Sequence, residues 1–396
     1  MIEPRSGRLG HYVTTVAFDE AVQAFVPPPL PPVPALELSS QLVQKLSDAD
    51  RAIGRLDGIT IMLPDKPLFL YMYVRKEAVL SSQIEGTQST LDDLLRFENA
   101  AVAGKPIDDV GEVSNYVGAM MYGLERLRDA SPQGLPLCLR LLREMHALLL
   151  KDGRGSAKEP GAFRKSQNWL GGSRPGNAIY VPPPVPDMEH CLAALETFLH
   201  TEDNLPPLIK AGLLHVQFES IHPFLDGNGR LGRLLIALFL AEKQVLREPL
   251  LYLSLYLKMH RSDYYRLMQE VRQRGKWEAW LEFFLTGVAA TANNAYDSAL
   301  RIVELFAFDR ARIVAAGEQA NSMLRVHALL QNQPFVNAAQ VCDKTGLSMP
   351  TVNSALAGLE KLQLVHEITG KRRGRVYAYQ AFLQIIDEGT DVATTL

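Results

Sequence analysis

The sequence has few cysteines and no long apolar run. Its three cysteines, Cys138, Cys191 and Cys342, are far apart and cannot all pair, which excludes a disulfide framework and fits a reducing compartment. No stretch is apolar over the roughly eighteen residues that a membrane helix needs, so we expect no membrane partner. The N-terminus lacks a charged segment followed by an apolar run, so we expect no signal peptide and predict a cytoplasmic protein.

Excess charge of one sign is also absent. The chain has 41 Lys and Arg residues against 44 Asp and Glu residues, a net charge of -3. This excludes a basic coat that binds nucleic acid along the whole molecule, although a local basic patch is still allowed. Hydrophobic residues make up 47% of the 396 positions, which is ordinary for a globular protein and enough for two or three domains.

One stretch, residues 221–233, holds a dense set of reactive and charged groups, IHPFLDGNGRLGR. The apolar run after it, residues 234–241, predicts a buried helix. A glycine-rich turn that opens a helix aims unpaired N–H groups at one point, and the helix dipole adds positive potential there, so the turn predicts an anion site. Arg230 and Arg233 share a face of the first helical turns, which favours a polyphosphate.

His222 and Asp226 flank this turn. A histidine can accept a proton near neutral pH, and an aspartate beside phosphates is a common ligand of Mg²⁺. Together these residues predict the transfer of a phosphorus-containing group to a nucleophile.

Residues 222–233 match the Fic family motif, His-Pro-Phe-x-(Asp/Glu)-Gly-Asn-Gly-Arg-x-x-Arg, at every defined position. The motif is far more specific than a short glycine-rich pattern, and the chain resembles the Fic family over roughly residues 60–310. The resemblance implies an all-α core with a small β-hairpin flap. It also implies an enzyme that transfers AMP from ATP to a Tyr, Thr or Ser hydroxyl of a target protein, itself included.

The resemblance assigns roles within the motif. It implies that His222 is the catalytic base for the target hydroxyl, and that Asp226 holds Mg²⁺ across the α- and β-phosphates of ATP. The groups that bind the phosphate oxygens and neutralise their charge then come from Gly227, Asn228, Gly229, Arg230 and Arg233.

A second motif lies upstream, at the end of a helix predicted over about residues 68–86. Ser81 and Glu85 are four residues apart and share a helix face, and Gly86 is placed to end the helix. A glutamate in a last turn is disfavoured by the helix dipole and needs a cationic partner; the alternative is a solvated surface charge. The segment resembles the inhibitory motif of Fic proteins, (Ser/Thr)-x-x-x-Glu-(Gly/Asn), which implies that Glu85 keeps the γ-phosphate of ATP from Arg233.

A Gly- and Pro-rich tract precedes the catalytic motif, and its turn-rich residues 172–176 predict a hairpin of two short strands. This segment resembles the flap of the family, which holds the target by strand addition. The resemblance implies that Ile179, Tyr180 and Val181 contact the target, and the alternative is an ordinary surface hairpin.

Tyr264 and Tyr265 resemble a tyrosine pair that borders the nucleotide in the family. An aromatic face can stack on adenine, although core packing explains at least one of the two rings equally well. His215, Glu219 and His222 share one side of a helix but lack the HExxH spacing, so we interpret His215 and Glu219 as packing or supporting groups.

The sequence predicts three parts. Residues 1–60 form an N-terminal arm and a first helix, residues 61–310 the Fic domain, and residues 318–396 a winged-helix (α+β) domain. The last part has a helix-turn-helix pattern over residues 338–362 and a basic hairpin tip over residues 369–375. In the arm, the proline-rich residues Pro27 to Pro34 predict an extended strap over the surface, or alternatively an SH3-type ligand.

We therefore predict a protein adenylyltransferase that is autoinhibited by Glu85. The winged helix has two interpretations, DNA binding through its basic tip or protein contact and formation of a homodimer. Other activities stay open. The same pocket could remove AMP from a protein or use another nucleotide diphosphate donor, or the chain could be a DNA-binding regulator whose Fic domain senses a nucleotide.

Overall fold

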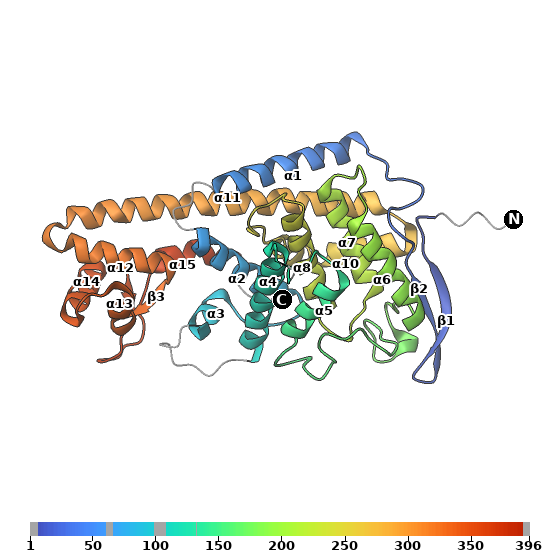
Figure 1. The fold of residues 1–396 in the computed structure, drawn as a ribbon, viewed down its shortest axis with the longest axis horizontal. Coiled ribbons are helices and arrows are strands. Elements are labelled where there is room, and N and C mark those ends of the chain that lie inside the picture. The colour runs from blue at the N-terminus through green and yellow to red at the C-terminus, as the bar shows by residue number, and fades with distance from the viewer. Residues whose placement is uncertain (1–6, 61–65, 99–107, 132, 391–396) are drawn as a thin grey trace.

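The computed structural model describes residues 7–60, 66–98, 108–131 and 133–390. Residues 61–65, at the predicted start of the Fic domain, and residues 391–396, at the predicted end of the winged helix, lie outside the described residues. The molecule is mostly helical and elongated, because the 39-residue helix α11 (Trp277–Ala315) runs along most of its length (Figure 1). No helix of the described part is long and apolar enough to cross a bilayer.

The centre of the molecule is the helix pair α7 (Pro207–Ile221) and α8 (Asn228–Glu242). Helix α7 is buried from Leu208 to its end, because apolar side chains occur on all its faces. The helices around this pair are α1 (Ser40–Ile59), α2 (Lys66–Ile84), α3 (Leu91–Glu98), α4 (Asp108–Arg128), α5 (Leu139–Leu149), α6 (Val185–His200), α9 (Ser254–Met259) and α10 (Arg261–Arg274). This arrangement confirms the mostly helical fold that was predicted.

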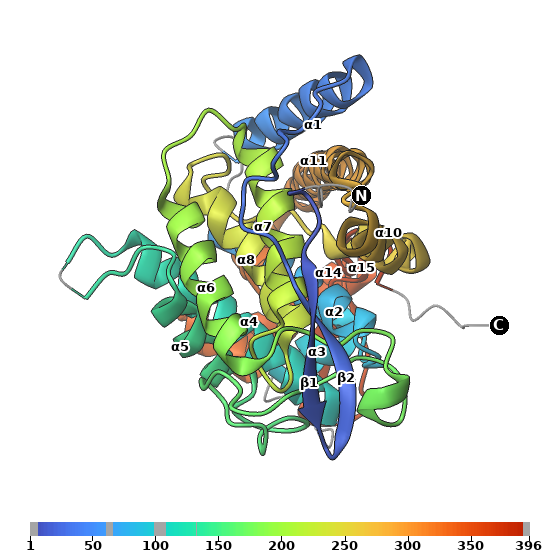
Figure 2. The same ribbon diagram turned by 90° about the vertical axis from the view of Figure 1, so that its right-hand side faces the viewer.

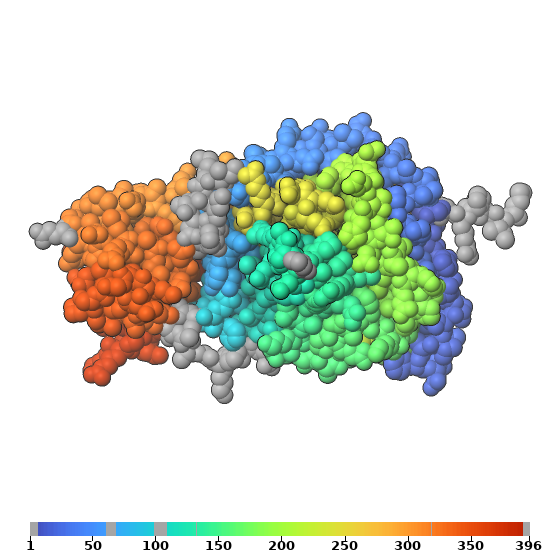
Figure 3. All heavy atoms as spheres, viewed as in Figure 1, coloured from blue at the N-terminus to red at the C-terminus, as the bar shows by residue number. Residues whose placement is uncertain are grey.

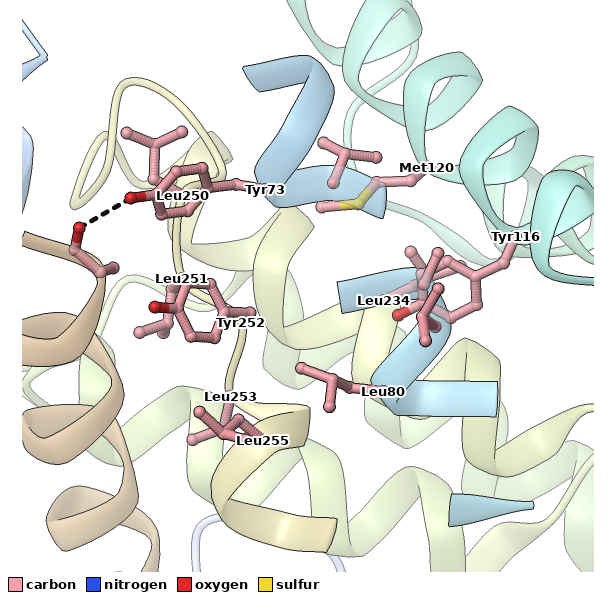
Figure 4. Close-up of a cluster of buried hydrophobic side chains, with 14 of the residues drawn as sticks. Tyr73, Leu80, Tyr116, Met120, Leu234, Leu250, Leu251, Tyr252, Leu253 and Leu255 are labelled. Atoms are coloured by element: carbon pink, nitrogen blue, oxygen red, sulfur yellow. Dashed lines mark hydrogen bonds between the residues drawn. The ribbon is translucent and has the colours of Figure 1, made fainter. Parts of the chain in front are cut away.

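Buried tyrosines fasten α2 to its neighbours (Figure 4). The ring of Tyr73 lies 5.4 Å from the ring of Tyr252, and its hydroxyl donates to the carbonyl of Ala295 in α11 at 2.7 Å. Tyr116 of α4 lies in the same cluster, close to Leu234 of α8 (Figure 4). These hydroxyls and rings are buried, so α2 is held against α4, α8 and α11 by packing as well as by polar contacts.

The N-terminal residues form an antiparallel hairpin, β1 (His11–Ala17) and β2 (Glu20–Val26), which the sequence analysis did not predict. The linking residues Phe18 and Asp19 both have positive φ, 49° and 63°. A two-residue hairpin turn needs this geometry and is usually signalled by Asn-Gly or Asp-Gly, a signal that this segment lacks. The hairpin lies across one end of the helical bundle, beside α6 (Figure 2).

The proline-rich segment after the hairpin follows the surface of the core. Gln217 of α7 donates its Nε2 to the carbonyl of Pro28 at 2.8 Å, and Arg8 donates its Nε to the carbonyl of Pro34 at 2.8 Å. These contacts agree with the interpretation of residues 27–34 as a strap.

The C-terminal part forms a lobe at one end of the molecule (Figure 3). Its helix-turn-helix occurs where it was predicted, and two short strands flank the predicted basic tip, whereas β3 and α15 were not predicted. The winged-helix assignment itself stays a prediction. The elements of the lobe are α12 (Ala320–Asn332), β3 (Phe335–Asn337), α13 (Ala338–Thr345), α14 (Met349–Lys361), β4 (His366–Glu367), β5 (Val376–Ala378) and α15 (Gln380–Asp387), with the strands in the order β3-β5-β4.

Candidate active site

The loop between α7 and α8 has a strained backbone. His222 ends α7 with φ 48° and ψ 62°, a left-handed conformation that is uncommon for a residue other than glycine, and Gly227 has φ 77° before α8 begins. The side chain of Asn228 holds the loop, because its Oδ1 accepts from Phe224 N at 2.9 Å and its Nδ2 donates to Phe224 O at 2.8 Å. The side chain of Asn228 is therefore engaged within the loop, and the role of Asn228 in holding a phosphate oxygen stays a prediction, with its backbone N–H as the available group.

Two arginines surround His222. Arg164 donates its Nε to the carbonyl of His222 at 3.0 Å, and Arg272 donates its Nε to Ser220 Oγ at 3.0 Å. Burial, together with the charges of Arg272 and Arg164, lowers the pKa of His222 to about 3. The imidazole is therefore neutral at pH 7, and no described residue hydrogen-bonds to its Nδ1. A neutral imidazole can accept a proton, and a bound polyanion would raise its pKa.

His146 of α5 packs against the loop and forms a hydrogen bond with it. Gly161 N donates to His146 Nδ1 at 2.8 Å, so the proton of the neutral ring lies on Nε2, which donates to the carbonyl of Asp226 at 3.0 Å. The ring stacks on Phe224 with centroids 3.8 Å apart, and burial lowers its pKa to about 4. His146 is thus a hydrogen-bonded core histidine.

Arg230, in the first turn of α8, is a buried cation. Its Nη1 lies 3.2 Å from Glu112 Oε2 in an ion pair whose side chains are 2% and 3% exposed, and its Nη2 lies 3.6 Å from Asp226 Oδ1. Arg230 Nε is buried without a hydrogen-bond partner among the described residues, so one donor is left for an anion. Sequence reasoning missed Glu112, because a single glutamate in a helix gives no sign of what it will contact.

Residues at the end of α2 accept hydrogen bonds from Arg233. The guanidinium donates its Nε to Ser81 Oγ at 2.7 Å and its Nη2 to both Ser81 O at 3.0 Å and Glu85 Oε1 at 2.6 Å. Gly86, with φ 100°, follows as the expected helix stop. A Cβ atom on Gly229 would lie 2.3 Å from Glu85 Oε1, so the glycine makes room for this carboxylate at the start of α8.

The electrostatics of this pair favour the charged forms. Burial alone would raise the pKa of Glu85, but the charge and hydrogen bond of Arg233, with Arg230 nearby, lower it overall. The pKa of Arg233 is raised, because the attraction of Glu85 outweighs the effect of burial. The carboxylate therefore takes the place at the helix N-terminus that an anionic ligand would take.

Asp226 carries the one acidic side chain of residues 222–227. Its Oδ1 accepts from Gly227 N at 2.6 Å, and its side chain is 34% exposed. Among the described residues no three His, Cys, Asp or Glu side chains cluster as a metal cage. One carboxylate beside a phosphate site still fits Mg²⁺, which keeps several waters and takes its remaining ligands from substrate phosphates.

The two tyrosines of α10 differ. Tyr264 is 1% exposed and contacts His215 Nε2 at 2.8 Å, while His215 Nδ1 contacts the carbonyl of Gly232 at 3.0 Å. Tyr264 and His215 thus pack against each other in the core, and a contact of Tyr264 with a nucleotide stays a prediction. Tyr265 is 40% exposed and is available to stack on a base.

Glu219, the other residue interpreted as a packing or supporting group, is a buried residue of α7. Its burial raises the pKa of the carboxyl to about 7.

The predicted flap hairpin is reduced to one β-bridge. Leu170 pairs with Tyr180, and a 3₁₀ turn (Pro175–Asn177) lies between them. Two strands do not form, because the three prolines after Val181 donate no backbone hydrogen bonds. Tyr180 and Val181 are buried, at 6% and 7% exposure, and only Ile179 is exposed, at 76%. Of these three residues, Ile179 is thus the one whose side chain is open to a partner, and the predicted contact of this segment with a target stays a prediction.

The hairpin β1–β2 covers one edge of the flap. Phe25 N donates to Val181 O at 2.9 Å, and Glu20 accepts from Gly176 N at 2.8 Å and pairs with Arg174 at 2.9 Å. The ring of Phe18 packs edge-on against Trp169, 5.2 Å between centroids. The N-terminal residues, to which sequence reasoning gave no role, thus hold the flap in place.

Glu77 of α2 is buried, with 4% of its surface exposed, and interacts electrostatically with Arg233. It accepts hydrogen bonds from Ser254 N at 3.1 Å and from Tyr116 OH at 3.3 Å, and also one from Ser254 Oγ. Burial nevertheless raises its pKa to about 7.

Replacement of Glu77 by glutamine tests this pKa. The carboxyl has a higher pKa folded than unfolded, so its stabilising effect is complete below about pH 4.5 and is lost as pH rises through about 7. Relative to wild type, Glu77→Gln should gain up to about 3 kcal/mol in free energy of unfolding between pH 4.5 and 8. Urea unfolding of both proteins across this range measures the difference, and a difference that does not vary with pH would contradict the raised pKa.

Comparison with known proteins gives two family matches. Residues 43–125 match the Fic/DOC family N-terminal description, and residues 136–240 match the Fic/DOC family description. The first match covers α2 and Glu85, and the second covers the flap and the loop that holds His222.

Relatives and solved structures agree with these matches. The protein adenylyltransferase Fic of Drosophila grimshawi is 34% identical over 157 residues, which are 39% of this chain and 30% of that protein. The same-named protein of Drosophila yakuba is 30% identical over 200 residues, 50% of this chain and 37% of that protein. The match thus spans about a third of these relatives. A Fic family protein from Desulfovibrio desulfuricans G20 shares the fold, with a TM-score of 0.56 and 22% identity, over 87% of this chain and 97% of that one.

Proposed function

We propose that the chain is a protein adenylyltransferase, which transfers AMP from ATP to a Tyr, Thr or Ser hydroxyl, since residues 43–125 and 136–240 match the two Fic/DOC family descriptions. The observation that carries this proposal is the loop before α8. There, a neutral imidazole ends α7, and a few residues later α8 begins with a free N-terminus and the unpartnered Nε of Arg230. The relatives of Drosophila bear the name of this activity.

Each of these residues has a separate role in the proposed reaction. His222 takes the proton of the target hydroxyl as the oxygen attacks the α-phosphorus, and pyrophosphate leaves. Arg230 and the first N–H groups of α8 stabilise the charge on the phosphates. Asp226 would hold Mg²⁺, which supplies further neutralisation of phosphate charge. Tyr265 is the ring we assign to the adenine side of the pocket.

Autoinhibition is part of the proposal. Three hydrogen bonds from Arg233 to Ser81 and Glu85 leave the guanidinium unavailable to a γ-phosphate. A triphosphate without this anchor would present its α-phosphorus at a poor angle for in-line attack. The inhibited state is therefore the one with α2 in the position described here.

The target is a protein with an accessible hydroxyl side chain, and the chain itself is one candidate. The exposed Ile179 and the short pairing of the flap support docking of an extended segment there. The identity of the target and the formation of a homodimer stay predictions.

Labelled ATP tests the proposed reaction. AMP transfer should label the protein from ATP labelled at the α-phosphorus and leave it unlabelled when the label is at the γ-phosphorus. Mass spectrometry should then find a phosphoadenosine adduct on a hydroxyl residue. Label from γ-ATP alone would contradict AMP transfer. Release of AMP from a modified protein, without any forward labelling, would instead support the reverse reaction.

We also propose that residues 318–390 form a winged helix that contacts duplex DNA. The basic segment between β4 and β5 projects from the lobe (Figure 3), and its residues Lys371, Arg372, Arg373 and Arg375 are exposed. With α14 it lines a groove of about 530 Å³. Clustered cations beside a groove suit phosphate contacts.

The double change Arg372→Ala with Arg373→Ala tests this contact. Removal of two phosphate contacts should weaken binding to duplexes of any sequence and make the slope of log K against log salt shallower by about 2. Fluorescence anisotropy of a labelled duplex across a salt series measures both quantities. Arg51→Ala with Arg55→Ala, on α1, is the matched control. Equal affinity of both double variants and wild type would remove DNA as a partner of this segment.

A further inference from the structure

The side chain of Gln83 joins the inhibitory helix to the far end of the described chain. Its Nε2 donates to Ser89 O at 2.9 Å and to Thr390 O at 2.8 Å, and its Oε1 accepts from Lys258 Nζ at 2.6 Å. The contact with Thr390 bridges 307 sequence positions. Gln83 lies in the last turn of α2, two residues before Glu85, so a force on its side chain acts on the segment that carries the inhibitory carboxylate.

The turn that carries Glu85 is held weakly by its own backbone. Glu85 N donates to Ser82 O at 3.0 Å, Gly86 N donates to Gln83 O at 3.1 Å, and Thr87 N donates to Ser82 O at 3.2 Å. The first two are bonds of 3₁₀ type, with poorer geometry than those of an α-helix, at a helix end where carbonyls lack partners within the helix. The position of the carboxylate therefore depends on contacts from outside the turn, and Gln83 makes three of them.

The partner of Gln83 is itself firmly placed. Thr390 is fully buried, and its backbone N donates to Asp387 O, at the end of α15, at 2.9 Å. Glu388, two residues before Thr390, accepts hydrogen bonds of 2.7 and 2.8 Å from Arg301 of α11. Helix α15 packs against α2, α3 and α11, and Figure 1 shows it at the side of the C-terminal lobe nearest α2. The lobe thus determines where the carbonyl of Thr390 lies.

We propose that Gln83 is a positioning residue through which α15 holds the carboxylate of Glu85 on Arg233. An event that shifts α15, such as ligand binding to the C-terminal lobe, then loosens the last turn of α2 and releases Arg233 to the γ-phosphate. This inference rests on the proposed function, and it adds a route by which the C-terminal lobe controls the active site.

Replacement of Gln83 by alanine is the direct test. Loss of the amide should raise self-labelling from α-labelled ATP by roughly two- to tenfold, the effect of about one net hydrogen bond on the population of the released state. Gln44→Ala is the matched control, because Gln44 is an exposed glutamine of α1 whose Nε2 donates to Asp48 of the same helix and not to the end of α2. Its labelling should equal that of wild type.

A double variant separates positioning from general destabilisation. If Gln83 acts through Glu85, Gln83→Ala should add nothing to the labelling of Glu85→Gly. A general loss of stability would change labelling in both backgrounds by the same factor. Wild-type labelling of Gln83→Ala, beside strong labelling of Glu85→Gly, would overturn the inference and leave the proposed function intact.

Hydrogen exchange provides a measurement that does not need activity. Amides of residues 80–87 should exchange faster in Gln83→Ala than in wild type, while those of α7 should keep their protection. If no variant labels at all, the proposed function fails, and unchanged exchange in residues 80–87 would then also overturn the role of Gln83.

Discussion

Replacement of His222 by alanine is expected to lower AMP transfer by about a hundred- to ten-thousandfold, the range that a general base contributes. The imidazole is neutral at pH 7, because burial and the neighbouring Arg272 and Arg164 lower its pKa. It is also fixed in a left-handed backbone conformation that aims it from the end of α7. An alanine provides no proton acceptor, and water cannot take over a role that needs fixed geometry.

The measurement should use Glu85→Gly as the background, so that the starting rate is high enough to follow a large loss. Incorporation of α-labelled phosphate over time gives the rate. His190→Ala is the control, since His190 is an exposed histidine of α6. A matched thermal midpoint for the two histidine variants would show that the loss is chemical. Equal rates for His222→Ala and His190→Ala would remove His222 from the reaction.

The sequence was informative where function requires several residue types at fixed spacing. The stretch from His222 to Arg233 needs one base, one acid, a flexible turn and two cations in order, and this combination is rare enough to identify the pocket. The contact between Glu85 and Arg233 was implied in the same way, by a second motif of the family, and it is present in the structure. Helix positions followed from apolar periodicity.

The sequence was uninformative where a role depends on which segments meet. Glu112 and Gln83 are single polar residues in helices, and their partners lie 118 and 307 positions away. The hairpin of residues 11–26 lacks the usual turn residues, so its strands gave no local signal. Asn228 carries the motif but bonds to its own loop, which shows that membership of a motif does not decide whether a side chain faces the ligand.

The pH dependence of inhibition follows from the same contacts. The pKa of Glu85 is lowered, because Arg233 outweighs the effect of burial. A carboxylate of this kind contributes its stabilising contact fully above its unfolded pKa, near 4.5, and loses it only as pH falls through the lower folded value. Mild acidification from pH 8 to 6 is therefore expected to leave the inhibitory ion pair intact. Under the proposed inhibition, release would then come from a movement of α2 and not from mild acid.

Replacement of Glu85 by glycine is expected to raise self-labelling by about ten- to a hundredfold, the equivalent of one hydrogen bond between charged groups. Arg233 keeps its contacts with Ser81 but loses the acidic partner that competes with a γ-phosphate. The affinity for ATP should rise more than that for AMP, since only the triphosphate reaches this arginine.

Titration calorimetry with both nucleotides, beside labelling with α-labelled ATP, measures the two effects. Glu202→Gly, in the exposed loop before α7, is the control for the loss of one glutamate. Glu85→Gln should fall between wild type and Glu85→Gly, because the amide keeps the shape of the side chain and can still accept a hydrogen bond from Arg233 without its charge. If Glu85→Gly bound ATP and labelled no better than Glu202→Gly, the ion pair with Arg233 would be a structural contact, and the inhibitory role of α2 would have to be abandoned.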